Sequence, residues 1–402
     1  MFNFLKRKQN INTELAILGL IMLINALSYG TIIPLLYPYS ARFGITPVTL
    51  SFLFASYSFF QFLATPIMGR LSDRYGRKPL LLISLLGTGI SLALFASATS
   101  ILMLFIARIL DGITGGNISV AQAMIADKVQ GKDKARAFGM LGAAFGFGFL
   151  VGPALGGILS QFSLSAPFWF ASILAFIGTF IGFFKLKESV HIVDVIKQKR
   201  EPLFNIKGLF KALFNPVVGT ILTVSLIAAT VSNSFIIGFN AYSVDILNLS
   251  AKQIGIIYTM AGFMSVVMQV FGIKILLQKF KTKESIVKVA LLGSFFSLLI
   301  LGFGLSFTFF TLILFIYMLF HAVITPLVSA ILSERSNSED QGYILGVNQS
   351  YISLGQIVGP LSAGLVSQVT IPAIFIWSAI LMYAGFLFIQ FTKRTRSTRV
   401  NI

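Results

Sequence analysis

The chain has 402 residues, of which 56% are hydrophobic and 11% charged, and its formal net charge is +18 at pH 7. It is too apolar for a soluble protein of this length and too poor in charge for a disordered one, so it belongs in a membrane. Its basic residues lie in clusters between apolar runs, which argues against a nucleic-acid-binding protein. It has no cysteine, which excludes disulfides and thiolate metal sites.

Long apolar runs alternate with short polar segments along the whole chain. A membrane-spanning helix needs about 20 apolar residues, and twelve runs meet this requirement. They are about 14–36, 50–68, 79–96, 101–125, 137–160, 166–184, 216–239, 252–273, 286–305, 309–331, 343–366 and 373–391. The basic N-terminal segment lacks a small-residue cleavage site, so we expect an uncleaved first span and not a signal peptide.

Lysine and arginine lie almost entirely on one side of the expected membrane. With both termini placed inside, 28 of the 31 basic residues fall in interior segments, and only Arg42 and Lys252 fall in outside loops. The positive-inside rule therefore places both termini in the cytoplasm. The long connection at 185–215 is then interior, and its amphipathic part at 203–214 predicts an interfacial helix, with a plain tether as the alternative.

A segment between the second and third spans combines one acid with several basic residues. It reads GRLSDRYGRKP at 69–79, and its second glycine permits a tight turn. The acid could pair with an arginine or lie at a helix N-terminus, so we expect a conformational latch; a basic loop with a stray acid is the alternative. The second half has only a worn copy at 274–281. The expected latch residues are Gly69, Asp73, Arg74, Gly76, Arg77 and Lys78.

The fourth span contains two charged residues well inside a helix, Arg108 and Asp111. At about 1.5 Å per residue they lie roughly 10 and 15 Å from the start of the span, so Asp111 is near the midplane. Three residues apart, they share a face and can pair. Ionisable residues inside a membrane are functional by default. Two hypotheses stay open: Asp111 carries a proton, or the two residues form a permanent ion pair that holds the span against a neighbour.

The tenth span contains a histidine, His321, about midway along its length. Its titration range suits proton coupling, and a packing role is the alternative. The residues expected to couple transport to protons are therefore Asp111, Arg108 and His321.

Glycines recur in a fixed pattern in the fifth and eleventh spans. The pattern of the fifth span returns at an offset of 207 residues, which predicts that the two halves are copies of one unit. Small residues at four-residue spacing let helices approach closely in lipid, and Gly-Pro favours a bend; an ordinary packing face is the alternative. The expected hinge residues are Gly139, Gly148, Gly152, Pro153, Gly156, Gly157, Gly355, Gly359 and Pro360.

Neutral polar and aromatic side chains within the spans are candidates to line a substrate cavity. Each could instead form an interhelical hydrogen bond. With 41 phenylalanines also available, the composition favours an amphipathic, drug-like substrate over a sugar. The candidates are Asn25, Tyr29, Tyr57, Gln61, Asn117, Gln122, Asn233, Asn240, Tyr258, Gln269, Asn348, Gln349, Tyr351 and Gln356.

Several of these motifs together resemble the drug/proton antiporter branch of the major facilitator superfamily. The fifth-span glycines are similar to a signature that marks exporters. The segment 69–79 resembles the superfamily's loop signature, which implies a latch that stabilises the outward-facing state. Arg108 and the glycines after it resemble the fourth-helix signature of proton-driven exporters, where the arginine is implicated in proton transfer.

The resemblance is closest to the tetracycline-resistance exporters over the first half, in QFLATPIMGRLSDRYGRKPLLLISLLG, ARILDGITGG, MIAD, FGFGFLVGPALGG, and APFWFA followed by KES. The departures lie at the acids. The first-span acid of those exporters falls at Asn25, their third-span acid falls at Ser91, and their ninth-span acid has no counterpart in 286–305. The chain therefore lacks the carboxylates for a magnesium chelate, and tetracycline is not inferred.

The expected fold is all-α, with twelve membrane helices in two pseudo-symmetric six-helix bundles, at 1–184 and 216–402, joined by the linker at 185–215. The expected function is proton-coupled efflux of small amphipathic compounds by alternating access. The alternatives are an importer or a metabolite or lipid carrier of the same fold, and a non-transporting sensor. We expect no enzymatic activity, cofactor or metal, a monomer in the bacterial cytoplasmic membrane, and as partners the substrate, protons and lipid.

Overall fold

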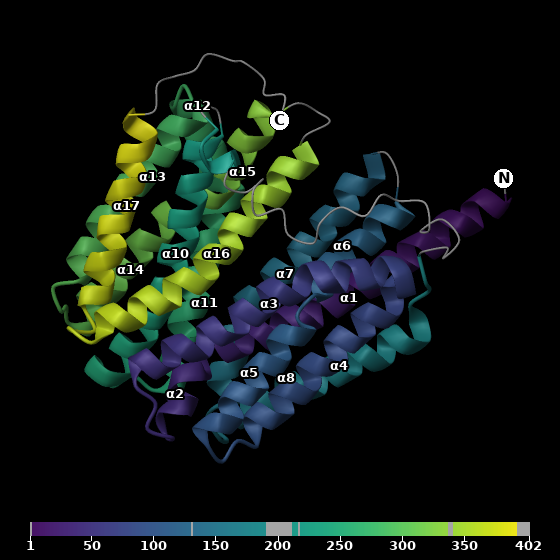
Figure 1. Cartoon of the computed structure of the whole chain (residues 1–402), viewed down its shortest axis with the longest axis horizontal. Coiled ribbons are helices and arrows are strands. Elements are labelled where there is room, and N and C mark those ends of the chain that lie inside the picture. The colour runs from purple at the N-terminus through teal and green to yellow at the C-terminus, as the bar shows by residue number, and fades with distance from the viewer. Residues whose placement is uncertain (1, 130–131, 190–210, 216–217, 337–340, 392–402) are drawn as a thin grey trace. The chain divides into compact units, whose positions relative to one another are not determined.

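A computed structural model describes residues 2–129, 132–189, 211–215, 218–336 and 341–391. Every regular element in this part of the chain is a helix (Figure 1). The first half contains α1 (Phe2–Ile32), η1 (Ile33–Leu35), α2 (Leu36–Ala41), α3 (Pro47–Tyr75), α4 (Arg77–Ala96), α5 (Ile101–Thr114), α6 (Asn117–Lys128), α7 (Lys132–Leu159) and α8 (Ala166–Lys185). The second half contains α10 (Gly219–Ala241), η3 (Tyr242–Ile246), α11 (Ala251–Val267), η4 (Met268–Gly272), α12 (Ile273–Lys279), α13 (Lys283–Leu301), α14 (Phe307–His321), α15 (Ile324–Arg335), α16 (Gln341–Ser367) and α17 (Ala373–Phe391).

Among the described residues, 11 stretches of helix are long and apolar enough to cross a membrane. They coincide with eleven of the twelve expected spans. The remaining expected span, 343–366, is α16, a more polar helix of 27 residues. The expected all-α fold is therefore confirmed, with helix at each of the twelve expected spans. Most of the expected interfacial helix at 203–214 lies outside the described residues.

The duplication is visible in where the helices break. In the first half a span is interrupted between the end of α5 at Thr114 and the start of α6 at Asn117. At the same offset of 207 residues, α14 ends at His321 and α15 begins at Ile324. Both halves therefore interrupt the same span at the same repeat position.

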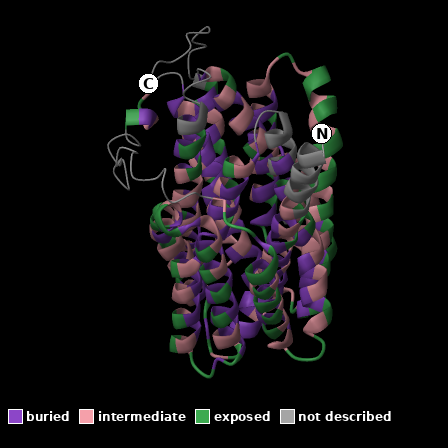
Figure 2. Ribbon diagram, turned by 90° about the vertical axis from the view of Figure 1, so that its right-hand side faces the viewer, coloured by how far each residue is buried: buried purple, intermediate pink, exposed green. Residues whose placement is uncertain are grey.

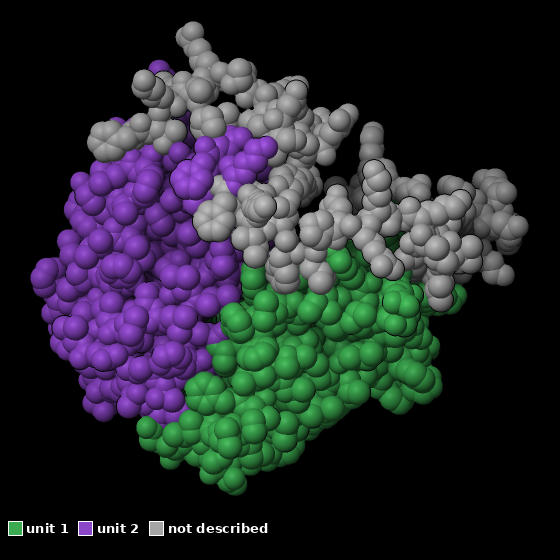
Figure 3. Space-filling model, in the orientation of Figure 1, with its two compact units in different colours: residues 1–44, 56–204, 250–259 green, residues 45–55, 205–249, 260–402 purple. Residues whose placement is uncertain are grey.

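The chain forms two compact units (Figure 3), one of residues 1–44, 56–204 and 250–259, the other of residues 45–55, 205–249 and 260–402. In the first unit α1 packs against α7 and α8, and α4 packs against α8 and α5. In the second unit α10 packs against α16 and α17, and α13 packs against α17 and α14. The helix pairs of the two units correspond one to one, as a duplication requires.

Several of the repeated glycines make close contacts between helices. A Cβ atom added to Gly152 of α7 would lie only 2.7 Å from the carbonyl carbon of Gly30 in α1. In the other unit, a Cβ atom on Gly355 of α16 would lie 2.8 Å from the backbone nitrogen of Thr230 in α10. These positions have no room for a side chain, because backbone packs directly on backbone. Gly148, Gly156 and Gly359 make the same kind of contact.

Not every glycine of the pattern is used in this way. A Cβ atom on Gly139, or on its counterpart Gly346, would have no neighbour within 4 Å. Pro153 and Pro360 lie inside α7 and α16. Many large apolar side chains are exposed, including Phe180 at 65% and Phe271 at 63%, and Figure 2 shows exposed residues along the outer sides of the helices. Such surfaces need a lipid environment.

Gly152→Ala is therefore expected to destabilise the protein, whereas Gly139→Ala is not. A methyl group at Gly152 forces α1 and α7 apart, at a cost of about 1–3 kcal/mol. The same methyl group at Gly139 meets open space and improves the helix propensity. Thermal unfolding of both variants in detergent should show a lower Tm for Gly152→Ala alone. Equal Tm values for the two variants would contradict the close packing of these helices.

Candidate functional site

The segment between α3 and α4 forms a tight turn at Gly76. This residue has a φ of +102°, which favours glycine. A Cβ atom here would collide with the carboxylate of Glu188. The turn places Asp73, near the end of α3, close to Arg77, the first residue of α4. Glycine is thus required both by the backbone and by the neighbouring acid.

Arg77 is the centre of an ion-pair cluster. Its guanidinium group lies 2.6 Å from Asp73 Oδ1 and 3.0 Å from Asp127 Oδ2, and it donates to Ser72 Oγ at 2.7 Å. Asp127 belongs to α6, so a single arginine connects α3, α4 and α6. The side chain of Arg77 is only 12% exposed, and a network around one shielded arginine is stronger than an isolated surface pair.

The other expected latch residues lie around this cluster. Lys78 Nζ donates to the carbonyl oxygen of Phe183 in α8 at 2.7 Å. The guanidinium group of Arg74 lies over the ring of Tyr75, its neighbour in the sequence. A Cβ atom on Gly69 would have no neighbour within 4 Å. The structure thus brings Asp73, Gly76, Arg77 and Lys78 together at the start of α4.

Three residues of this cluster were missed by the sequence analysis: Asp127, Glu188 and Ser189. Glu188 accepts hydrogen bonds from the backbone N–H groups of Arg77 at 2.8 Å and Lys78 at 3.1 Å. Its carboxylate therefore caps the positive end of α4. Ser189 Oγ lies 3.3 Å from Asp127 Oδ2. The MIAD and KES segments, which contain these three residues and were noted only as parts of the resemblance, were the available signal.

The second unit has ion pairs at the matching helix ends, made by other residues. Lys283 pairs with Glu334, and Arg335 pairs with Glu284 at 2.9 Å, so that α13 and α15 are joined by two crossed bridges. At the offset of 207 residues, Glu284 and Glu334 correspond to Arg77 and Asp127. The loop motif of the first half is thus poorly preserved in the second half, but ion pairs still join α13 and α15, the counterparts of α4 and α6.

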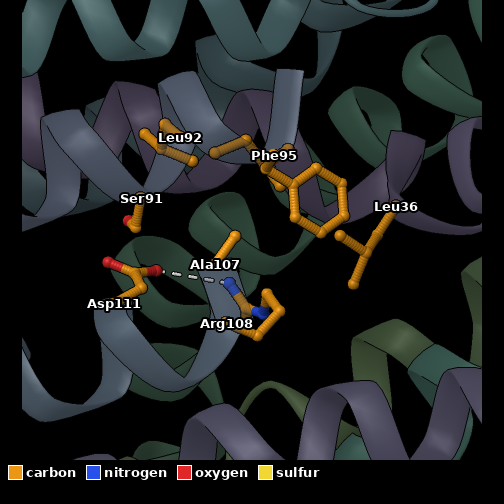
Figure 4. A pocket seen from close by; sticks show the side chains of 8 residues that line it. Leu36, Ser91, Leu92, Phe95, Ala107, Arg108 and Asp111 are labelled. Carbon is orange, nitrogen blue, oxygen red and sulfur yellow. Dashed lines mark hydrogen bonds and ion pairs between the residues drawn. The ribbon is translucent and has the colours of Figure 1, made fainter. Parts of the chain in front are cut away.

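The buried charge pair in α5 is the second cluster of the first unit. Arg108 and Asp111 are 5% and 7% exposed. Arg108 donates from one terminal nitrogen to Asp111 Oδ2 at 3.3 Å, and Thr88 Oγ1 donates to Asp111 Oδ1 at 3.1 Å. The guanidinium carbon lies 4.1 Å from the ring centroid of Tyr57, a cation–π contact. Figure 4 shows the pair, with Ser91 beside the carboxylate.

Glycines after the pair bring α3 close enough to make these contacts. A Cβ atom on Gly112 would lie 2.7 Å from the carbonyl oxygen of Tyr57, and one on Gly116 would lie 2.8 Å from Met68 Cβ. Tyr57 is thereby held over Arg108. The glycines of the fourth span therefore have a packing role that explains their place beside the charges.

Some of the expected cavity residues join this cluster. Gln61 Nε2 donates to Tyr57 Oη at 2.8 Å, and the rings of Tyr29 and Tyr57 are 6.1 Å apart. Tyr29, Tyr57 and Gln61 are all half-buried. The structure therefore brings three of the cavity candidates into one group with Arg108 and Asp111.

The remaining cavity candidates are placed differently. In the first unit Asn25 and Tyr258 are half-buried, Asn117 is buried and Gln122 is exposed. In the second unit Ser225 Oγ donates to Asn348 Oδ1 at 2.5 Å in a buried bond between α10 and α16. The other side chains there are buried (Asn240, Tyr351), half-buried (Asn233, Gln356) or exposed (Gln269, Gln349).

His321 belongs to the second unit, whereas Arg108 and Asp111 belong to the first. It is the last residue of α14, and its ring centroid lies 5.2 Å from that of Tyr317. Its Nδ1 atom is buried and has no hydrogen-bond partner among the described residues. His321 therefore packs on the ring of Tyr317, and its Nδ1 atom bonds to no acid among the described residues.

Glu188→Ala is expected to lower stability, because it removes the cap from α4 and loosens the Arg77 cluster. Loss of a helix cap costs about 0.5–2 kcal/mol. Lys187→Ala is the matched control, since the hydrogen bond of this exposed neighbour to another described residue, Lys128 Nζ, is made by its backbone oxygen. Thermal unfolding in detergent should separate the two variants. If both variants unfold at the same Tm, the contact between Glu188 and the start of α4 does not stabilise the protein.

Comparison with known proteins places this arrangement in a family. The family model described as "Major Facilitator Superfamily" matches residues 18–287 and 222–401. Multidrug resistance protein 2 of Bacillus subtilis is 29% identical over 389 residues, covering 94% of this chain and 95% of the relative. The class C tetracycline resistance protein of Escherichia coli is 32% identical over 359 residues, covering 87% and 88%.

Solved structures agree on the fold. The human organic anion transporter MFSD10 superposes with a TM-score of 0.68 at 22% identity, covering 94% of this chain and 99% of that one. A bacterial homologue of the lysosomal transporter Spinster superposes with a TM-score of 0.78 at 13% identity, covering 95% and 96%. The chain therefore belongs to the Major Facilitator Superfamily, and it is a membrane transporter and not an enzyme.

Proposed function

We propose that this protein exports small amphipathic compounds in exchange for protons, by alternating access between two bundles at 1–184 and 216–402, joined by the linker at 185–215. The relatives support export, since their names describe resistance to several drugs, to tetracycline and, for NorA of Staphylococcus aureus, to quinolones. The basic residues on one side support cytoplasmic termini, in a bacterial cytoplasmic membrane. The protein acts as a monomer.

The observation that carries proton coupling is the buried Arg108–Asp111 pair. A charge pair in an apolar span is costly unless it has a function or excellent geometry. Here the bond is long, at 3.3 Å, and Thr88 supplies one further hydrogen bond to the carboxylate. Protonation of Asp111 would break the pair and free Arg108. A permanent structural pair remains the competing explanation.

The proposed proton-coupling pair, Arg108 and Asp111, is in contact with the group formed by Tyr29, Tyr57 and Gln61. Tyr57 contacts the Arg108 guanidinium on one side and Gln61 on the other. A flat or amphipathic compound that stacks on Tyr29 and Tyr57 would therefore alter the surroundings of Arg108 directly. This contact gives substrate binding and protonation a shared residue, which is what an exchange mechanism needs.

Metal–tetracycline is not proposed as the substrate. The positions at which the resembled exporters have acids are Asn25, half-buried on α1, and Ser91, buried on α4. Neither side chain is charged, so neither supplies the carboxylate that a magnesium chelate prefers. The Arg77 cluster would act as the latch, since it joins three helix ends that a rocking motion must rearrange.

Asp111→Asn is expected to abolish pH-driven transport, because the amide cannot exchange a proton. In inverted vesicles with an imposed pH gradient, substrate uptake by this variant should be at least about tenfold lower than uptake by the wild type. Asp245→Asn, which neutralises an exposed acid on η3, is the control and should transport normally. Since an unpaired Arg108 costs about 3–5 kcal/mol, the folded fraction must be measured in parallel.

Undiminished pH-driven transport by folded Asp111→Asn would remove this residue from the mechanism. Substrate accumulating in the opposite direction would favour an importer. No pH-dependent flux for a broad panel of amphipathic compounds would contradict proton coupling and the proposed substrate class.

A further inference from the structure

A small cavity adjoins Asp111 and Arg108 (Figure 4). It has a volume of about 10 Å³ and is lined by Ile32, Leu36, Ser91, Leu92, Phe95, Ala107, Arg108 and Asp111. All of these residues belong to the first unit and lie on α1, α2, α4 and α5. This volume is about what a single water molecule needs.

Three polar residues are among those that line the cavity, and each has hydrogen-bonding capacity left. Arg108 Nε is buried and has no hydrogen-bond partner among the described residues. Ser91 Oγ donates to the carbonyl oxygen of Thr88 at 2.9 Å, so its lone pairs can still accept. The Asp111 carboxylate accepts one bond from Thr88 and one from Arg108, which leaves further lone pairs. A buried water typically makes two to four such bonds.

The cavity and the aromatic group have different side chains around the ion pair, since Tyr29, Tyr57 and Gln61 do not line the cavity. The charged and titratable groups that face Asp111 are Arg108 on α5, Tyr29 on α1 and Tyr57 on α3. The helix α4 presents only the neutral Thr88 and Ser91. Besides Ser91, α4 contributes the apolar side chains of Leu92 and Phe95 to the lining of the cavity.

We propose that this cavity binds the water or hydronium ion that exchanges protons with Asp111, separately from the face that meets the substrate. The inference rests on the proposed coupling role of Asp111. A hydronium O–H bond breaks, its proton moves to Asp111 Oδ2, and the remaining water accepts a hydrogen bond from Arg108 Nε. Release reverses the step: Asp111 returns its proton to the water and pairs with Arg108 again.

If the cavity is the proton site, an acid at position 91 should be able to replace the acid at position 111. Ser91 and Asp111 line the same cavity from α4 and α5, so an acid at either position would reach the same water. The double variant Ser91→Asp/Asp111→Asn moves the carboxylate across the cavity and retains one acid beside Arg108. It should recover part of the pH-driven transport that Asp111→Asn loses.

Filling the cavity provides the complementary test. Ala107→Leu puts three extra carbons into the space and should lower pH-driven transport in inverted vesicles at least about tenfold, while substrate binding in detergent persists. Ala93→Leu adds the same volume on α4, at a half-buried position that does not line the cavity, and should transport normally. Ser91→Ala removes one water partner without adding bulk and should shift the pH profile, even if Ala107→Leu folds poorly.

The outcomes separate the inference from the proposed function. If Asp111→Asn is inactive but Ser91→Ala and folded Ala107→Leu keep the wild-type pH profile, the cavity is not the proton site, although Asp111 remains the carrier. A double variant no better than Asp111→Asn would also overturn the shared site. If Asp111→Asn itself transports normally, the proposed function fails first.

Discussion

The buried pair between Arg108 and Asp111 is the interaction on which the account of this transporter depends. Two charges at this depth are tolerated only because helices approach closely enough to surround them. Glycines supply that approach: Gly112 brings α3 against α5, so that Tyr57 covers the guanidinium group, while Thr88 on α4 donates to the carboxylate. The same small residues that cost helix propensity in water thus create the surroundings in which this charge pair can be buried.

The duplication accounts for the arrangement of the helices, but the two units differ in their charged and titratable residues. The two units share their helix pairs, their glycine contacts and the position of the broken span. At that break, however, the first unit has Thr114 and the second has His321. The ion pairs at the helix ends also differ, since Arg77 and Glu284 occupy equivalent positions with opposite charge. Structural roles therefore follow the repeat, whereas the buried charged side chains of the described residues, Arg108 and Asp111, belong to the first unit.

Sequence patterns predicted the parts of the structure that depend on local chemistry. Apolar runs gave the spans, the offset of 207 residues gave the duplication, and a glycine before Arg77 gave the tight turn. The patterns did not predict partners that tertiary packing brings together. Glu188 lies 111 residues from the helix end that it caps, and Asn348 lies 123 residues from Ser225. The sequence around Glu188 and Asn348 does not show whether their side chains form hydrogen bonds within the protein or are exposed to solvent.

The most direct test of the account is to observe the proton on Asp111 itself. Infrared difference spectra of the purified protein in lipid should show a protonated carboxyl band that changes when an amphipathic substrate is added. The account predicts that this band is absent in Asp111→Asn and persists in the surface variant Asp245→Asn. A band of the same frequency and size in Asp111→Asn would contradict it, because the proton that moves on substrate binding would then belong to another group.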